Sequence, residues 1–327
     1  MKKIRVCLAV ILAAACCLSA AAVCGEAELT YGVALQTNRE YKSELYPYVV
    51  HGETASWFLA LADIEEYGLE AMCEGLAVTM ENMEADLADA REVLADYLID
   101  DVPVVRICTD FCDHAAMAQE AGAYYNGARN IIKLFHSWDD GQQSLLHEYV
   151  HYLTFKCAKT MIRFGFWSEG IAEYTAMLRC RNRMRRSVLA RLPEEMMQEA
   201  RSRNVLDADG AVSLERMYLM LSEQALQGLL VGEKYDAASN QIITRTEEIQ
   251  QNPKSYELSY PEAANMVAWL AETYGEDFIF SHWDSDPEQF EEIFGKGFPE
   301  LYREWAAWNG AKCEELGIIT EKELITQ

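Results

Sequence analysis

The amino-acid sequence predicts an α+β fold, with a mixed N-terminal lobe at residues 28–140 and a mostly helical lobe at residues 141–327. The first lobe is predicted because short β-branched and aromatic runs, bounded by turn residues, recur before residue 140 and indicate a small sheet. The second is predicted because apolar residues recur at helical spacing after that point. Half of the 327 residues are apolar, so the chain can bury a sizeable core.

Residues 1–27 have the pattern of an export signal, in which basic residues precede an apolar run and small residues follow it. The run spans residues 6–23, and cleavage is expected after residues 20–22 or near Ala27. The mature protein is then secreted or extracytoplasmic. Two alternatives remain: the run is just long enough to be kept as a membrane anchor, or Cys16 carries a lipid. We expect contact with a membrane only through such an N-terminus.

The elements of the two lobes follow from local patterns. Residues 28–61 form short β-like runs, and residues 63–98 place apolar side chains at helical spacing, which predicts one long amphipathic helix or two in sequence. The run PVVRICTDF, residues 103–111, suits a buried strand, and residues 121–135 suit another strand or a hairpin. After residue 140 helix follows helix, with breaks near glycine and proline.

The formal net charge of −25 makes nucleic acids and anionic membrane surfaces poor partners for the protein as a whole. An arginine cluster between Arg179 and Arg191 is the exception. We expect this cluster to be a solvated helix face that pairs with acids elsewhere, for example in the acid-rich stretch 81–101. The alternative is a surface that binds an acidic partner or substrate. The sequence does not indicate an oligomeric state.

Six cysteines remain once the export signal is removed. An even number in an exported chain permits disulfides, but none of the six shows the spacing of a zinc ribbon. The alternative is that they are small, buried, apolar side chains. The six are Cys73, Cys108, Cys112, Cys157, Cys180 and Cys313.

A metal-binding pattern, H-E-x-x-H, occurs in the segment SLLHEYVHYLTF, whose apolar residues are spaced as in a helix. His147 and His151 are four residues apart, so their imidazoles lie on one helix face, about 6 Å apart along the axis, and can converge on one ion. Glu148 occupies an adjoining edge, where a carboxylate can take a proton from metal-bound water without becoming a ligand. The alternative is a pair of surface histidines beside a glutamate.

A third ligand is expected from the segment FWSEGIAEY, residues 166–174, which follows a turn at Gly165 and has the character of a helix start. Zinc in a hydrolase takes three protein ligands and keeps one position for water, and a carboxylate on a second helix completes such a set. Glu169 and Glu173 are both candidates, because they lie one helical turn apart.

HEYVH, seventeen intervening residues and WSEGIAEY together resemble the gluzincin metallopeptidases, the clan that includes thermolysin and aminopeptidase N. The resemblance implies a zincin-like fold with the active site between two lobes, and one Zn²⁺ per chain held by His147, His151 and Glu169. It makes Glu173 a neighbour that orients a histidine. The matched pieces cover about residues 122–308.

Two flanking segments extend the resemblance. GAYYNGARNIIKL, residues 122–134, is similar to the edge strand that binds extended substrate beside the metal in such enzymes, with an ordinary sheet strand as the alternative. LSYPEAANMVAWLAETYG, residues 258–275, is similar to the helix whose leading tyrosine donates a hydrogen bond to the tetrahedral intermediate. That tyrosine is Tyr260 here, and His282 is a weaker candidate for the same task.

The resemblance implies a zinc metallopeptidase that acts on a peptide or protein substrate, with Glu148 as general base. A G-x-M-E-N segment, which captures the free amino terminus in the aminopeptidase branch, does not occur in the sequence, so endopeptidase action is expected. Two other functions remain open. One is an exported binding or surface protein that keeps the fold without turnover, and the other is a zinc amidase that acts on cell-wall peptides.

Overall fold

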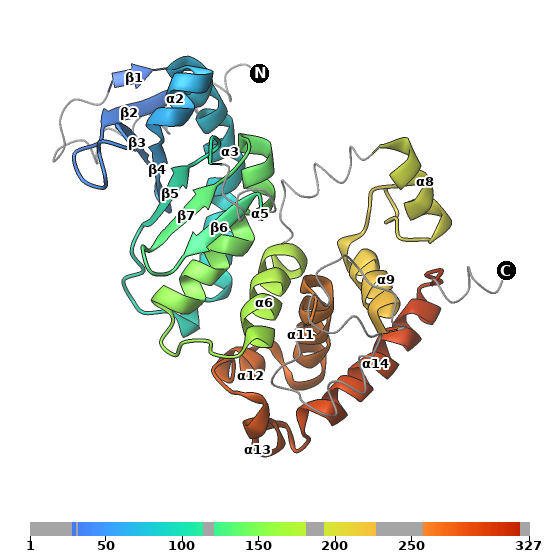
Figure 1. The fold of residues 1–327 in the computed structure, drawn as a ribbon. Coiled ribbons are helices and arrows are strands. Elements are labelled where there is room, and N and C mark those ends of the chain that lie inside the picture. The colour runs from blue at the N-terminus through green and yellow to red at the C-terminus, as the bar shows by residue number, and fades with distance from the viewer. Residues whose placement is uncertain (1–27, 31, 114–120, 181–192, 227–257, 321–327) are drawn as a thin grey trace, which may run out of the picture. The chain divides into compact units, whose positions relative to one another are not determined.

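A computed structural model describes residues 28–30, 32–113, 121–180, 193–226 and 258–320 (Figure 1). They divide into two compact units. The first takes the described residues of Met1–Ala85 and Val104–Leu145, and the second takes those of Asp86–Pro103 and Leu146–Gln327. The proposed export signal at 1–27 lies outside the described residues. Within them, no helix has the length and apolar character that crossing a membrane requires.

The first unit contains a seven-stranded mixed sheet, which confirms the α+β class and the predicted sheet. Its first four strands are antiparallel. The strands β4 (Ala55–Leu59), β5 (Val105–Thr109) and β7 (Ile131–Leu134) are parallel, and β6 (Ala123–Asn126) returns antiparallel to β7 as the edge strand. The predicted strand at 103–111 and hairpin at 121–135 are therefore confirmed. In sheet order the strands are β1 (Glu28–Thr30), β2 (Val33–Thr37), β3 (Tyr48–His51), β4 (Ala55–Leu59), β5 (Val105–Thr109), β7 (Ile131–Leu134) and β6 (Ala123–Asn126).

The helical stretch predicted at 63–98 is two helices in sequence, α2 (Leu61–Tyr67) and α3 (Leu69–Val93). The break falls at Gly68, whose φ of 85° lies in the region that glycine adopts without strain. In the first unit, α3 is tied to the sheet through Glu84. Its carboxylate accepts hydrogen bonds from Trp57 Nε1 at 3.2 Å and from the Thr54 backbone N–H at 3.1 Å.

The second unit is helical, as predicted for the C-terminal part of the chain. A helix shared by both units, α5 (Trp138–Tyr152), leads into it. Short π-helical turns continue both α5 and α6 (Gly165–Glu173). Within the described residues, the elements that follow α5 are η2 (Leu153–Cys157), α6 (Gly165–Glu173), η3 (Tyr174–Arg179), α8 (Glu194–Ser202), α9 (Leu214–Leu226), α11 (Tyr260–Tyr274), α12 (Glu276–Ser281), η4 (Pro287–Gln289), α13 (Phe290–Phe294) and α14 (Phe298–Glu315).

The close packing of α6 on α11 fixes the centre of the second unit. A Cβ atom at Gly170 of α6 would stand 2.8 Å from Val267 Cγ2 and 3.1 Å from the Ala263 carbonyl oxygen, both on α11. Trp167, also on α6, is fully buried and donates a hydrogen bond from Nε1 to Ser285 Oγ at 3.1 Å. The position of α6 is therefore set by its packing against its neighbours.

The six cysteines are free thiols, and four of them are buried. The structure thus agrees with the reading of these residues as small apolar side chains rather than as disulfides. Of the arginine cluster, Arg179 is described and its Nε lies 3.0 Å from a Glu276 carboxylate oxygen, an acid outside the stretch 81–101. The arginines at 181–191 lie outside the described residues.

Candidate metal centre

The helix α5 brings the two histidines of the H-E-x-x-H pattern together. His147 and His151 are separated by slightly more than one helical turn, and their ring centroids are 4.7 Å apart. Both side chains are buried, as are Leu146 and Val150, which anchor the same stretch of helix. Glu148 is half-buried beside His147. The predicted helix and the shared face of the two imidazoles are therefore present.

Glu169 completes the cluster from α6. One of its carboxylate oxygens, Oε2, lies 3.2 Å from His147 Nε2 and 3.2 Å from His151 Nε2. Of the two candidate ligands left open by spacing alone, Glu169 is thus the one that meets both Nε2 atoms. Its side chain keeps 35% of its surface exposed, so the cluster is reachable from solvent. Within the described residues, this is the group of side chains that could hold a metal ion.

The two distances from Glu169 Oε2 are compatible with a metal ion such as zinc. In a tetrahedral zinc site with bonds of about 2.0–2.2 Å, neighbouring donor atoms are about 3.3 Å apart. The two distances of 3.2 Å from Glu169 Oε2 match that separation, and all three donor atoms lie within 4.8 Å of one another. Two imidazole nitrogens and one carboxylate oxygen are also a known ligand set of catalytic zinc.

Glu173, one turn beyond Glu169, lies on the other side of the His147 ring. His147 Nδ1 donates to Glu173 Oε2 at 2.8 Å, and Glu173 is 5% exposed. This bond fixes the ring and leaves Nε2, the atom that faces Glu169, as the nitrogen that could bind a metal ion. By contrast, His151 Nδ1 is buried and has no hydrogen-bond partner in the described part of the chain.

In the metal-free protein, the histidines and the carboxylates of this site stabilise one another's charged forms. Burial disfavours the His147 imidazolium, but the neighbouring carboxylates of Glu169 and Glu173 outweigh burial and raise the pKa of His147 above its usual value. Burial likewise opposes ionisation of Glu169, but hydrogen bonds from His147 and His151 prevail and hold the pKa of Glu169 well below its usual range. A cation in place of these protons would satisfy the same carboxylate.

Sequence reasoning missed one residue of this site. Tyr218, on α9, is 1% exposed and its hydroxyl donates a hydrogen bond to Glu173 Oε1. No sequence signal marks it, because it is one of 17 tyrosines and follows Glu173 by 45 positions. The π-helical turns η2 and η3, which begin two residues after His151 and directly after Glu173, were not predicted either; such turns are frequent at functional sites.

Tyr260 contacts the cluster from the start of α11. Its ring meets the His147 ring edge to face, with 5.5 Å between centroids, and the side chain is 45% exposed. A reciprocal cap holds this helix end: Ser259 Oγ accepts from the Glu262 backbone N–H, and the Glu262 carboxylate accepts from the Ser259 backbone N–H at 3.0 Å. The residue is therefore presented by a fixed helix start beside His147, a candidate metal ligand.

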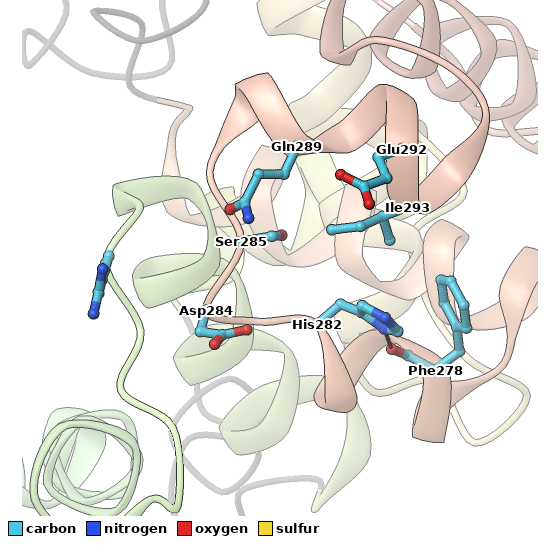
Figure 2. Close-up of a pocket in the computed structure, with 8 residues that line it drawn as sticks. Phe278, His282, Asp284, Ser285, Gln289, Glu292 and Ile293 are labelled. Atoms are coloured by element: carbon cyan, nitrogen blue, oxygen red, sulfur yellow. Dashed lines mark hydrogen bonds between the residues drawn. The ribbon is translucent and has the colours of Figure 1, made fainter.

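His282, the other candidate for that task, has different surroundings. Its Nδ1 donates to the Phe278 carbonyl oxygen at 2.7 Å, one turn back along the chain. It lines a hollow of about 530 Å³, and none of the candidate metal ligands His147, His151 and Glu169 lines this hollow (Figure 2). The lining consists of Arg163, Phe278, His282, Asp284, Ser285, Gln289, Glu292 and Ile293.

The segment 122–134 forms the hairpin of β6 and β7, and β6 is an edge strand of the sheet. This hairpin belongs to the first unit. The candidate metal ligands His147, His151 and Glu169 belong to the second unit, as do Tyr218 and Tyr260. Its part in binding substrate stays a prediction.

Comparison of the chain with protein-family models, with curated proteins and with solved structures gives no match.

Proposed function

We propose that the chain is a zinc-dependent metallopeptidase of the gluzincin type with a zincin-like fold, which acts as an endopeptidase on exported or extracellular peptides and proteins. One observation carries the proposal: His147 Nε2 and His151 Nε2 each lie 3.2 Å from the same oxygen of Glu169. This convergence is what a single tetrahedral cation requires of three ligands. An unrelated pair of surface histidines would be neither buried nor aimed at one carboxylate oxygen.

One Zn²⁺ would be held by His147, His151 and Glu169. When bound, zinc supplies a Lewis acid that polarises the scissile carbonyl and makes water nucleophilic near neutral pH. The neighbouring carboxylate of Glu148 takes one proton from the attacking water, and that proton passes to the amine nitrogen as the C–N bond breaks. Glu148 thus returns to its starting state in each turnover.

Two further residues have supporting roles. The Tyr260 hydroxyl donates a hydrogen bond to the oxygen that gains negative charge when water adds to the carbonyl, since the ring already stands beside His147. A phenol suits this task because it remains a neutral donor near pH 7. Glu173 holds the His147 imidazole through Nδ1.

The substrate class follows from the resemblance of the motif rather than from the charge of the protein. The net charge of −25 disfavours strongly acidic substrates and nucleic acids at long range. The proposed export places the substrate outside the cytoplasm. A cell-wall peptide would meet the same chemistry at the metal, so it belongs among the substrates to be tested.

Cleavage by the purified protein and by its Glu148→Gln variant tests the proposal. Both proteins are incubated with a peptide library and with peptidoglycan fragments, and products are identified by mass spectrometry. We expect the native protein to cleave internal peptide bonds. Glu148→Gln should retain its metal and lose cleavage, and Glu66→Gln, a change at an exposed residue of α2, should keep both properties.

The other outcomes separate the competing functions. Metal retained with no cleavage of any substrate by the native protein would favour a binding protein that keeps the site without turnover. Cleavage confined to cell-wall peptides would favour the amidase. Equal cleavage by the native protein and Glu148→Gln would contradict the role of the general base.

A further inference from the structure

The Glu173 carboxylate is held at both of its oxygens by buried groups. Oε2 accepts from His147 Nδ1 at 2.8 Å, and Oε1 accepts from the Tyr218 hydroxyl. Tyr218 and Glu173 are 1% and 5% exposed, so water competes little for these bonds. With a donor on each oxygen, the carboxylate is restrained against rotation about its own axis.

The direction of these bonds follows from the acidities of the groups. A phenol is a far weaker acid than a carboxylic acid, so the proton between Tyr218 and Glu173 stays on the phenol and the carboxylate accepts. The carboxylate is then free to accept the Nδ1 proton of His147 as well. Once His147 has lost its Nε2 proton, the neutral imidazole still donates from Nδ1 and presents its lone pair at Nε2, the atom that lies beside Glu169.

A buried polar network fixes the helix that carries Tyr218. One turn beyond it, Ser222 Oγ accepts from Asn265 Nδ2 of α11 at 3.0 Å. Asn309 of α14 donates from Nδ2 to the Leu219 carbonyl oxygen at 3.2 Å, and Asn265 also donates to the Asn309 side chain. All these side chains are buried. The position of α9 along α11 and α14 is therefore specified by hydrogen bonds, and the Tyr218 hydroxyl is presented from a fixed place.

We propose that Tyr218 is a positioning residue of the metal centre: its hydroxyl holds Glu173 in the orientation in which Glu173 fixes the His147 imidazole for metal binding. This inference rests on the metal site of the proposed function. Without the hydroxyl, Glu173 Oε1 loses this hydrogen bond in a buried site and the carboxylate turns more freely. Loss of such outer contacts typically weakens metal binding 10–100-fold. We expect about a tenfold loss of zinc affinity for Tyr218→Phe, the lower end of that range, because Tyr218 acts through Glu173.

Zinc dissociation constants, measured by competition with a chelator, test this directly. Tyr174→Phe is the matched control. It also removes a phenol–carboxylate hydrogen bond in the second unit, the one to Glu276 at 2.8 Å, but that carboxylate does not belong to the cluster. We expect Tyr174→Phe to bind zinc within about twofold of the native protein, given that it leaves the contacts around the ligands intact. Equal affinities of Tyr218→Phe and the native protein would overturn the inference.

A double-mutant cycle separates positioning from a general loss of structure. If Tyr218 acts through Glu173, then Tyr218→Phe should have no further effect on zinc affinity in a Glu173→Gln background. A full and additive loss in that background would overturn the inference. Should Tyr218→Phe fold poorly, the native zinc-loaded protein gives a second readout. Its His147 Nδ1 proton should exchange slowly with solvent in an NMR spectrum, and Glu173→Gln should accelerate that exchange; rapid exchange in the native protein would also overturn the inference.

The proposed function and this inference fail in different ways. Zinc binding with no cleavage by the native protein would overturn the peptidase and leave the affinities of the Tyr218 variants as valid evidence. Cleavage with unchanged affinity in Tyr218→Phe would leave the peptidase standing and overturn the inference. A native protein that binds no zinc would overturn both.

Discussion

Replacing Gly170 with alanine tests whether the contact between α6 and α11 places Glu169. The added Cβ would stand 2.8 Å from Val267 Cγ2 and 3.1 Å from the Ala263 carbonyl oxygen, and the second of these atoms cannot rotate away. Overpacking of this kind costs about 1–3 kcal/mol. A glycine-to-alanine change within a helix gains about 1 kcal/mol of helix propensity, which offsets part of that cost.

Gly310 provides the control for the propensity term. It lies within α14, and a Cβ there meets no atom within 4 Å, so Gly310→Ala should stabilise the protein by up to about 1 kcal/mol. The two variants gain the same propensity, so the free energies of unfolding should differ by the overpacking cost alone, about 1–3 kcal/mol.

Denaturant unfolding of the metal-free proteins measures that difference, and chelator competition measures zinc affinity. We expect Gly170→Ala to be the less stable variant and to bind zinc more weakly, because a shift of α6 relative to α11 would change the 3.2 Å distances between Glu169 and the two imidazoles. Gly310→Ala should bind zinc as the native protein does. Equal stability of the two variants, with native zinc affinity in Gly170→Ala, would refute the reasoning.

Two other predictions concern the reaction and the metal. Tyr260→Phe should lower kcat about 10²–10³-fold with unchanged zinc content, since it removes the proposed donor to the developing oxyanion; an unchanged kcat in steady-state assays would exclude that role. Zinc affinity should rise with pH. Burial lowers the pKa of His147, but the carboxylates of Glu169 and Glu173 outweigh burial and raise it, so the imidazole stays protonated to higher pH. Zinc must displace that proton in order to bind. Calorimetric titrations between about pH 6 and pH 8 should show an increase approaching tenfold per pH unit, and a flat profile would contradict a protonated His147.

Much of the fold and of the cluster follows from local patterns. The i,i+4 spacing of His147 and His151 required only that their segment be helical, and the apolar spacing indicated that it is. Glu169 and Glu173 share a helix for the same reason. The β-branched run in 103–111 likewise predicted the strand β5, and the pattern in 121–135 predicted a strand or a hairpin, which is the β6–β7 hairpin.

Tertiary contacts could not be read from the same patterns. Periodicity shows which face of a helix is buried, but not which side chains of other elements pack against that face. The hydrogen bond from Tyr218 to Glu173 could therefore not be predicted from the sequence. The grouping of Asp86–Pro103 with the second unit depends on backbone pairing with a later segment, for example from Ile99 N–H to the Cys157 carbonyl oxygen at 2.8 Å. The boundary predicted near residue 140 was based only on the change from strand-like to helical patterns along the sequence, so it could not place residues 86–103 in the second unit.

The metal content and coordination of the purified native protein provide the most direct test of the metal centre. Elemental analysis and X-ray absorption at the zinc edge should show one zinc per chain, bonded to nitrogen and oxygen at about 2.0–2.2 Å, with the signature of two imidazoles. Glu169→Ala should reduce the zinc content under the same conditions. A protein that retains no zinc, or that binds zinc through sulfur at about 2.3 Å, would contradict the assignment of His147, His151 and Glu169 as its ligands.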